Sequence, residues 1–168
     1  MHLARGLRSP LRIAIGADRA GRRYASALTG ELSAHPLVDY VLDLDTTERP
    51  PAYPEVAVAF AGAQLVAEGA ADRALLVSHT GVDMAIAANK VSGVRAVNAH
   101  DPLAAKAAVE ASDAQVLTLG QGHIGLDVAR HVVAAWVTFQ FDSSAPAAAG
   151  VAVITGYENR IARPVAFR

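Results

Sequence analysis

The 168-residue chain contains no cysteine, which excludes disulfides, thiolate-bound metals and a thiol nucleophile. Aromatic residues make up only 5% and charged residues 18%, whereas hydrophobic residues make up 52%, a composition typical of a folded globular domain. The net charge is −1 with both signs interspersed, so we expect no nucleic-acid partner. No apolar run approaches the roughly 18–20 residues that cross a bilayer. These absences predict a cytoplasmic protein without a membrane partner.

The chain also shows no internal repeat and no low-complexity linker, so we expect residues 1–168 to form one domain. Residues 1–10 carry two arginines but no apolar core. This segment is therefore expected to be an N-terminal tail and not a signal peptide.

Short apolar segments alternate with alanine-rich helical segments along the chain. This alternation predicts a three-layer α/β/α fold, a doubly wound five-stranded parallel sheet of the Rossmann-like kind. Strands are expected at residues 11–16, 38–43, 74–77, 94–97 and 116–119, and helices at 20–34, 55–69, 84–89, 103–111 and 126–137. Residues 38–43 alternate apolar and acidic side chains, which favours a position near the sheet edge. An extra C-terminal helix over 145–160 has no strand after it, so we expect it to pack on a second subunit.

Ligands of open parallel sheets bind in the turns that follow the carboxyl ends of the strands. The most informative of these turns is residues 78–83, where Gly81 permits close approach and the next helix supplies unpaired amides for an oxyanion or phosphate. The alternative is an ordinary helix cap made by Thr80 or Asp83. In the first turn, Asp18 interrupts a G-x-G-x-x-G pattern and would repel a pyrophosphate, so a nicotinamide site is not expected.

Several motifs occur in an order and spacing that resemble a known family, that of ribose-5-phosphate isomerase B and the galactose-6-phosphate isomerase subunits. The motifs are Gly16-Ala17-Asp18-x-Ala20-Gly21, Tyr53-Pro54, Thr80-Gly81-Val82, Ile86-Ala87-Ala88-Asn89-Lys90-Val91, Gly93-Val94-Arg95-Ala96 and Asp113-Ala114-x-Val116-Leu117 followed by Gly120. The resemblance covers roughly residues 11–142. Residues 99–101 and 141–145 look most similar to an actinobacterial branch that includes D-erythrulose-4-phosphate isomerases.

The resemblance implies an aldose–ketose isomerase that acts on a phosphorylated sugar through an enediolate, without a metal or cofactor. The substrate would be ribose 5-phosphate (with ribulose 5-phosphate) or a four-carbon erythrulose or erythrose 4-phosphate. The family's sites lie between two subunits, which implies a homodimer or a dimer of dimers. Carried over to this chain, the substrate-binding residues would be Asp18, Arg19, Tyr53, Thr80, Gly81, Val82, Asn98 and His100.

The chain departs from the family pattern at the positions that carry catalysis. Ser78 stands where the usual base is a cysteine, and a serine hydroxyl forms no useful anion without an activating neighbour. Met84 stands where a second branch has a glutamate. Two histidines of the family, the second of which opens the sugar ring, are replaced by Arg19 and Ala111. Two glycines are replaced by His79 and Asp83. An arginine is replaced by Gly122, and the positions of the tail arginines fall near Ala145 and Ala149.

Two residues of the turn could replace the missing base. Asp83 lies one position before the glutamate site, and His79 has a side chain whose ordinary pKa is near 6.5. Ser78, Asp83, His79 and Thr80 are therefore the candidate catalytic residues. Arg19, or Arg22 with Arg23, could hold the phosphate in place of the tail arginines. The alternative function is a non-catalytic homologue that binds a sugar phosphate or partners a catalytic paralogue.

Overall fold

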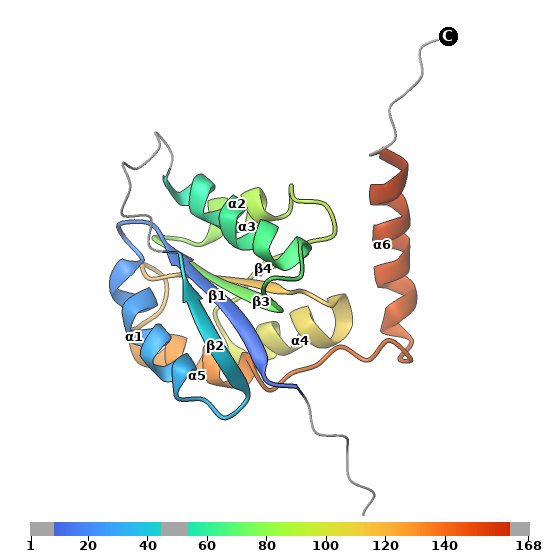
Figure 1. Cartoon of the computed structure of the whole chain (residues 1–168). Helices are drawn as coiled ribbons and strands as arrows, with labels where there is room; N and C mark the ends of the chain where they lie inside the picture. The colour runs from blue at the N-terminus through green and yellow to red at the C-terminus, as the bar shows by residue number, and fades with distance from the viewer. Residues whose placement is uncertain (1–8, 45–53, 162–168) are drawn as a thin grey trace, which may run out of the picture.

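The apolar segments of the sequence form one five-stranded parallel sheet with strand order β2-β1-β3-β5-β4 (Figure 1). The computed structural model describes residues 9–44 and 54–161. The strands are β1 (Leu11–Ala17), β2 (Val38–Asp43), β3 (Arg73–Ser78), β4 (Ala96–Asn98) and β5 (Val116–Gly120). The predicted doubly wound sheet is confirmed, and β2 lies at an edge as its alternating pattern indicated. Every residue of β3 and β5 is buried because both strands are interior to the sheet.

Helices cover both faces of the sheet, as Figure 1 shows. Helices α1 (Arg22–Ser33), α4 (Pro102–Ser112) and α5 (Leu126–Trp136) cover one face, and α2 (Pro54–Ala67) and α3 (Val82–Ala88) cover the other. Side chains of β3 alternate between the two cores: Leu75 and Val77 pack with the first set, and Ala74 and Leu76 with the second. The alanine-rich composition thus allows close helix–sheet packing.

The family-like motifs around β4 have structural roles. Asn89, at the end of α3, accepts from the Ala96 amide through Oδ1 (2.8 Å) and donates to the Ala96 carbonyl through Nδ2 (2.8 Å). Arg95 binds the Asp113 carboxylate at 2.6 Å, and Asp113 adopts a left-handed conformation (φ 48°) that ends α4. These bonds set where the short strand β4 begins, two residues later than the predicted start at residue 94.

The sixth helix, α6 (Ala147–Ile161), stands beside α4 at one side of the molecule (Figure 1). The Gly93 amide donates to its Glu158 carboxylate at 2.9 Å. None of its residues is buried, and Val153, Ile154, Tyr157 and Ile161 are all more than half exposed. Within the described residues, no helix is both long and apolar enough to cross a membrane.

Gly21 allows the turn after β1 to lie against the end of β3. Its φ of −79° suits any residue, so the backbone conformation does not require glycine. A Cβ at this position, however, would lie 2.1 Å from the Val77 carbonyl oxygen and 2.4 Å from its carbon. The close approach of two backbones therefore requires the missing side chain.

We expect Gly21→Ala to lower the free energy of unfolding by about 2 kcal/mol or more, because overpacking against backbone cannot be relieved by a rotamer change. Gly30→Ala is the matched control, since a Cβ there meets nothing within 4 Å inside helix α1. That change should stabilise the protein by about 0.5–1 kcal/mol. Urea unfolding of both variants measures the difference, and equal stabilities would contradict the close approach.

Candidate functional site

The candidate site is built on the turn after β3, residues 78–83, which we call the β3 turn. Its first residue, Ser78, is buried and pairs with Gly120 of β5. The Ser78 hydroxyl oxygen accepts a hydrogen bond from the Gly81 amide at 2.8 Å. Gly81 has a φ of +78°, a conformation that favours glycine. Ser78 therefore caps its own turn.

Four consecutive carbonyls of the β3 turn accept hydrogen bonds from the neighbouring part of the sheet. Backbone amides after β5 donate to the carbonyls of Ser78 (3.0 Å) and His79 (2.9 Å). Side chains donate to the next two: Asn98 Nδ2 to Thr80 (3.1 Å) and Thr118 Oγ1 to Gly81 (2.8 Å). The turn is consequently fixed in position relative to β4 and β5.

The helix that follows the turn keeps fewer free amides than the sequence suggested. The Gly81 amide binds Ser78, and the Val82 amide donates to Thr80 Oγ1 at 3.2 Å. The Ala85 amide donates to the Gly81 carbonyl at 3.1 Å. The amides of Asp83 and Met84 precede this bond and have no carbonyl one turn earlier within the helix. The donors suited to an oxyanion are thus the amides of Asp83 and Met84. They lie one or two residues further along the chain than that of Val82, which donates to Thr80.

The two candidate bases and Met84, at the position of the second branch's glutamate, lie in different environments. His79 and Asp83 are exposed, whereas Met84 is fully buried in the core under α2 and α3. Position 84 therefore faces the protein interior, and the polar side chain beside it, Asp83, faces outward. Ser78 and His79 point away from each other, as successive residues at a strand end do.

Asp18 lies in the turn after β1, directly beside the end of β3. Its carboxylate accepts from the Gly21 amide at 2.7 Å, and its own amide donates to the Val77 carbonyl at 3.2 Å. Asp18 is half-buried and Arg19 is exposed. The carboxylate thus shapes this turn while it stays at the same sheet edge as the β3 turn.

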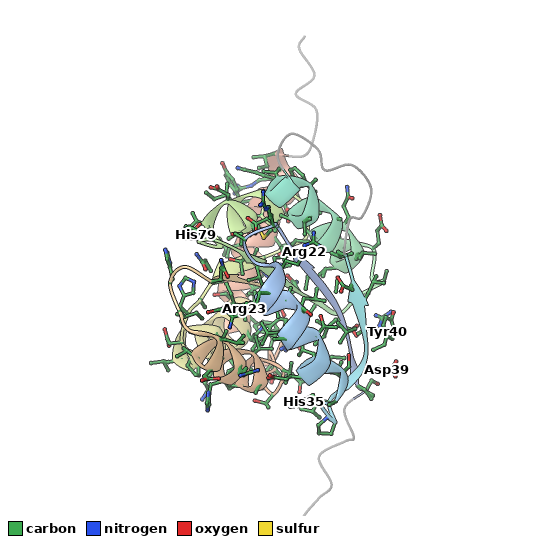
Figure 2. The ribbon with its side chains drawn as sticks, turned by 90° about the vertical axis from the view of Figure 1, so that its left-hand side faces the viewer. Arg22, Arg23, His35, Asp39, Tyr40 and His79 are labelled. Atoms are coloured by element: carbon green, nitrogen blue, oxygen red, sulfur yellow. The ribbon has the colours of Figure 1, made fainter. Side chains whose placement is uncertain are left out.

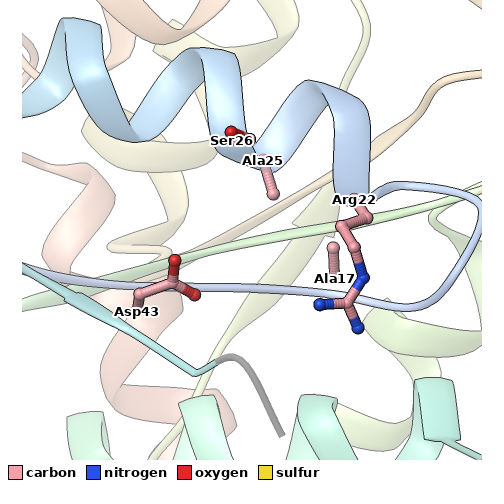
Figure 3. Close-up of a pocket in the computed structure, with 5 residues that line it drawn as sticks. All are labelled: Ala17, Arg22, Ala25, Ser26 and Asp43. Carbon is pink, nitrogen blue, oxygen red and sulfur yellow. The ribbon is translucent and has the colours of Figure 1, made fainter. Parts of the chain in front are cut away.

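Arginines gather where helix α1 begins, at the carboxyl edge of the sheet. In Figure 2, Arg22 and His79 lie toward one end of the molecule, and His35 and Asp39 lie toward the other. A cavity of about 220 Å³ opens beside Arg22 and is lined by Ala17, Arg22, Ala25, Ser26 and Asp43 (Figure 3). Because Asp43 brings a carboxylate into this cavity, it is a poor place for a phosphate. Arg19 and Arg23 are exposed and are not among the lining residues.

Two of the predicted ligand residues lie at the end of β4 and just after it, and they support the turns beside them. Asn98 holds the Thr80 carbonyl, and its Oδ1 is buried with no hydrogen-bond partner among the described residues. His100 Nε2 accepts from the Gly120 amide at 3.0 Å, which places the proton of a neutral imidazole on Nδ1. The ring of His123 lies at 5.1 Å from that of His100 in an edge-to-face arrangement.

Burial and then the positive charge of His123 hold the pKa of His100 below its ordinary value of 6.5, against a smaller opposite effect of Asp101. The unfolded chain takes up this proton at a higher pH than the folded protein does. Between the two pKa values the unfolded state binds more protons, so the stability present above pH 6.5 is lost as the pH falls. Protonation also removes the acceptor for the Gly120 amide.

We expect His100→Gln to flatten this loss of stability, because an amide oxygen can accept from Gly120 without titrating. Urea unfolding measured from about pH 8 down to about pH 5 gives the slope. His123→Gln serves as the partial control and should reduce the slope less than His100→Gln. An unchanged slope in His100→Gln would show that other groups cause the acid sensitivity.

The structure brings most of the predicted site residues to one sheet edge. Ser78 and Asn98 end strands β3 and β4, and Asp18, Arg19, His100 and the rest of the β3 turn follow the carboxyl ends of strands. Tyr53 lies outside the described residues. The sequence analysis missed Thr118, which is fully buried and holds the Gly81 carbonyl. A hydroxyl side chain in an otherwise apolar strand could have indicated this role, because buried polar groups need partners.

The described residues contain no group of three or more histidine, aspartate or glutamate side chains that could hold a metal ion. These residues form a set of polar turns on the carboxyl edge of a doubly wound sheet. The turns carry amides, a carboxylate and arginines. This is the class of α/β protein that binds small polar or anionic ligands at that edge.

Comparison with known proteins defines the class further. The sequence profile of the family described as Ribose/Galactose Isomerase matches residues 13–154. The chain is 46% identical over 154 residues to D-erythrulose-4-phosphate isomerase 2 of Mycolicibacterium smegmatis, covering 88% of this chain and 97% of that protein. It is 35% identical over 139 residues to ribose-5-phosphate isomerase B of Escherichia coli, covering 78% and 86%.

Solved structures show the same likeness. The ribose-5-phosphate isomerase B of Clostridium thermocellum superposes with a TM-score of 0.82 at 28% identity, covering 90% of this chain and all of that one. The chain therefore belongs to the ribose/galactose isomerase family, and the resemblance inferred from its motifs is confirmed.

Proposed function

We propose that this protein is an aldose–ketose isomerase of a phosphorylated sugar that works through an enediolate without a cofactor. The supporting observation is the rigid β3 turn at the sheet edge of a chain whose relatives are sugar-phosphate isomerases. Such a reaction needs a base beside two adjacent carbons and donors for the developing oxyanion. A four-carbon erythrulose 4-phosphate is the preferred substrate, because the family's ring-opening histidine is Ala111 here and a four-carbon ketose phosphate forms no furanose ring.

We assign the proton transfer to Asp83. It is the carboxylate at the start of α3, and it lies beside the amides of its own residue and of Met84. Its neighbour Met84 is fully buried and takes no proton, whereas Asp83 is exposed. His79 is the second candidate for the base. Ser78 is assigned to the shape of the turn, because its hydroxyl oxygen already accepts from Gly81.

The substrate would lie across the turns after β1 and β3. Asp18 would bind hydroxyl groups through the carboxylate oxygen that does not hold the Gly21 amide. Arg19 and Arg23 are exposed at the start of α1 and would hold the phosphate. Thr80, Gly81, Val82, Asn98, His100 and Tyr53 complete the proposed binding residues.

Incubation with D-erythrulose 4-phosphate or ribose 5-phosphate in deuterated water tests the reaction directly. We expect deuterium to enter beside the carbonyl, and Asp83→Asn to slow this exchange by about 10²-fold or more, the usual contribution of a general base. His79→Ala should retain exchange within about tenfold, which makes it the matched control. The reverse pattern would assign the base to His79.

One observation favours a different function, a non-catalytic homologue that binds a sugar phosphate. Ser78 and Gly81 satisfy each other, so the position of the family's usual base and one expected oxyanion donor are both occupied. In that case the wild-type protein would bind a sugar phosphate in calorimetry but exchange no deuterium with either substrate.

We further propose that the protein is a homodimer in which helix α6 packs on the second subunit. Val153, Tyr157 and Ile161 recur at helical spacing of four and form an apolar stripe that is 58–71% exposed. Glu158, which accepts from the Gly93 amide before β4, lies on another face of the helix. An apolar stripe of this kind on a soluble protein marks a protein interface.

We expect Val153→Glu to convert the dimer to a monomer, because an unpaired charge would be buried in the interface. Asn159→Glu places the same charge on the opposite side of α6 and should leave the dimer intact. Light scattering after size-exclusion chromatography gives the mass of each variant. A wild-type monomer, or equal behaviour of the two variants, would contradict the proposed interface.

A further inference from the structure

The imidazole of His79 lies directly on Gly122, in the turn after β5. A Cβ at Gly122 would lie 2.4 Å from His79 Cε1, 2.8 Å from Nδ1 and 2.9 Å from Nε2. All three distances are shorter than the 3.0 Å that real Cβ atoms respect. A side chain at position 122 would therefore clash with the ring in its present position. The ring packs directly on this glycine because the glycine has no side chain.

The backbones under the ring are held together by hydrogen bonds. The Gly122 amide donates to the His79 carbonyl at 2.9 Å, and the Gln121 amide donates to the Ser78 carbonyl at 3.0 Å. Asn98 holds the following carbonyl, that of Thr80, at 3.1 Å. A clash between Gly122 and His79 would have to be relieved by movement of the ring, because both backbone segments belong to the same hydrogen-bonded ladder.

The ring stands at one side of the candidate site. His79 is exposed and directly follows β3, whose neighbours in the sheet are β1 and β5. Asp18 follows β1, and Gly122 follows β5. A ligand that spans the turns after β1 and β3 would thus meet the imidazole as a wall on the β5 side. Displacement of the ring away from Gly122 would push it toward the space in which this ligand is placed.

We propose that His79 is a specificity-determining residue that limits the length of the sugar phosphate, and that Gly122 is the positioning residue that holds its ring. This inference rests on the isomerase function proposed above. The wall would favour a four-carbon over a five-carbon substrate by steric exclusion, because a ring packed on Gly122 would occupy the space for one more CHOH group. The role differs from that of a base, since it needs only the volume of the ring.

The experiment compares kcat/KM for D-erythrulose 4-phosphate and ribose 5-phosphate in three variants and the wild type. His79→Ala should shift the ratio toward the five-carbon substrate by about tenfold or more, the effect of one methylene-sized change in a pocket. Gly122→Ala should raise KM for both substrates with little change in kcat, because it displaces the ring. Gly125→Ala is the matched control in the same turn, since a Cβ there meets nothing within 4 Å.

The double variant His79→Ala with Gly122→Ala shows whether Gly122 acts through the ring. It should behave as His79→Ala alone, a coupling that a merely structural effect of alanine at position 122 would not produce. An unchanged substrate ratio in His79→Ala, or an additive double variant, would overturn the inference.

A binding measurement separates this inference from the proposed function. If the wild type exchanges no deuterium with either substrate, the isomerase proposal fails. Calorimetry with the phosphorylated aldonic acids of four and five carbons then tests the wall by itself. A wild-type preference for the four-carbon acid that His79→Ala removes would support the wall, and equal affinities in the wild type would overturn it.

Discussion

The hydrogen bonds that hold the β3 turn are the constraint on which the rest of the site depends. Four consecutive carbonyls, from Ser78 to Gly81, are bound by groups of β4, β5 and the turn after β5. A turn that binds a ligand at a sheet edge would otherwise carry unpaired backbone groups and move freely. Because these carbonyls are satisfied, the turn presents its side chains in one arrangement.

Close backbone approaches and a further hydrogen bond join the turns after three neighbouring strands. Gly21 lets the first turn touch the end of β3, and a Cβ at Gly120 would lie 2.5 Å from the Thr80 carbonyl oxygen. His100 in turn binds the Gly120 amide from the β4 side. Site residues from distant parts of the sequence are thereby held by backbone contacts, which are stiffer than contacts between long side chains. Such preorganisation is what stabilisation of an enediolate requires.

Ser78 and Met84, at two positions that the family resemblance associates with the base, have structural roles in this chain. Ser78 uses its hydroxyl oxygen to cap the turn, and Met84 fills the core between α2 and α3. Polar character is left at Asp83 and His79, both exposed at the sheet edge. The chain thus keeps the fold of its family, and the proposed function places its reactive groups at shifted positions.

Alternation of apolar and alanine-rich segments was enough to determine the doubly wound sheet, its edge strand β2 and the turns that carry the candidate site. These features depend on periodicity and on glycine positions, which are local properties of the sequence. The start of β4 was predicted two residues early, because side-chain bonds of Asn89 and Arg95 decide it. Only the tertiary structure shows three other contacts. The Gly81 amide donates to Ser78, Thr118 donates to the Gly81 carbonyl, and the His79 ring packs on Gly122. Each of these joins residues whose distance in space is set by the packing of whole strands, which no local pattern records.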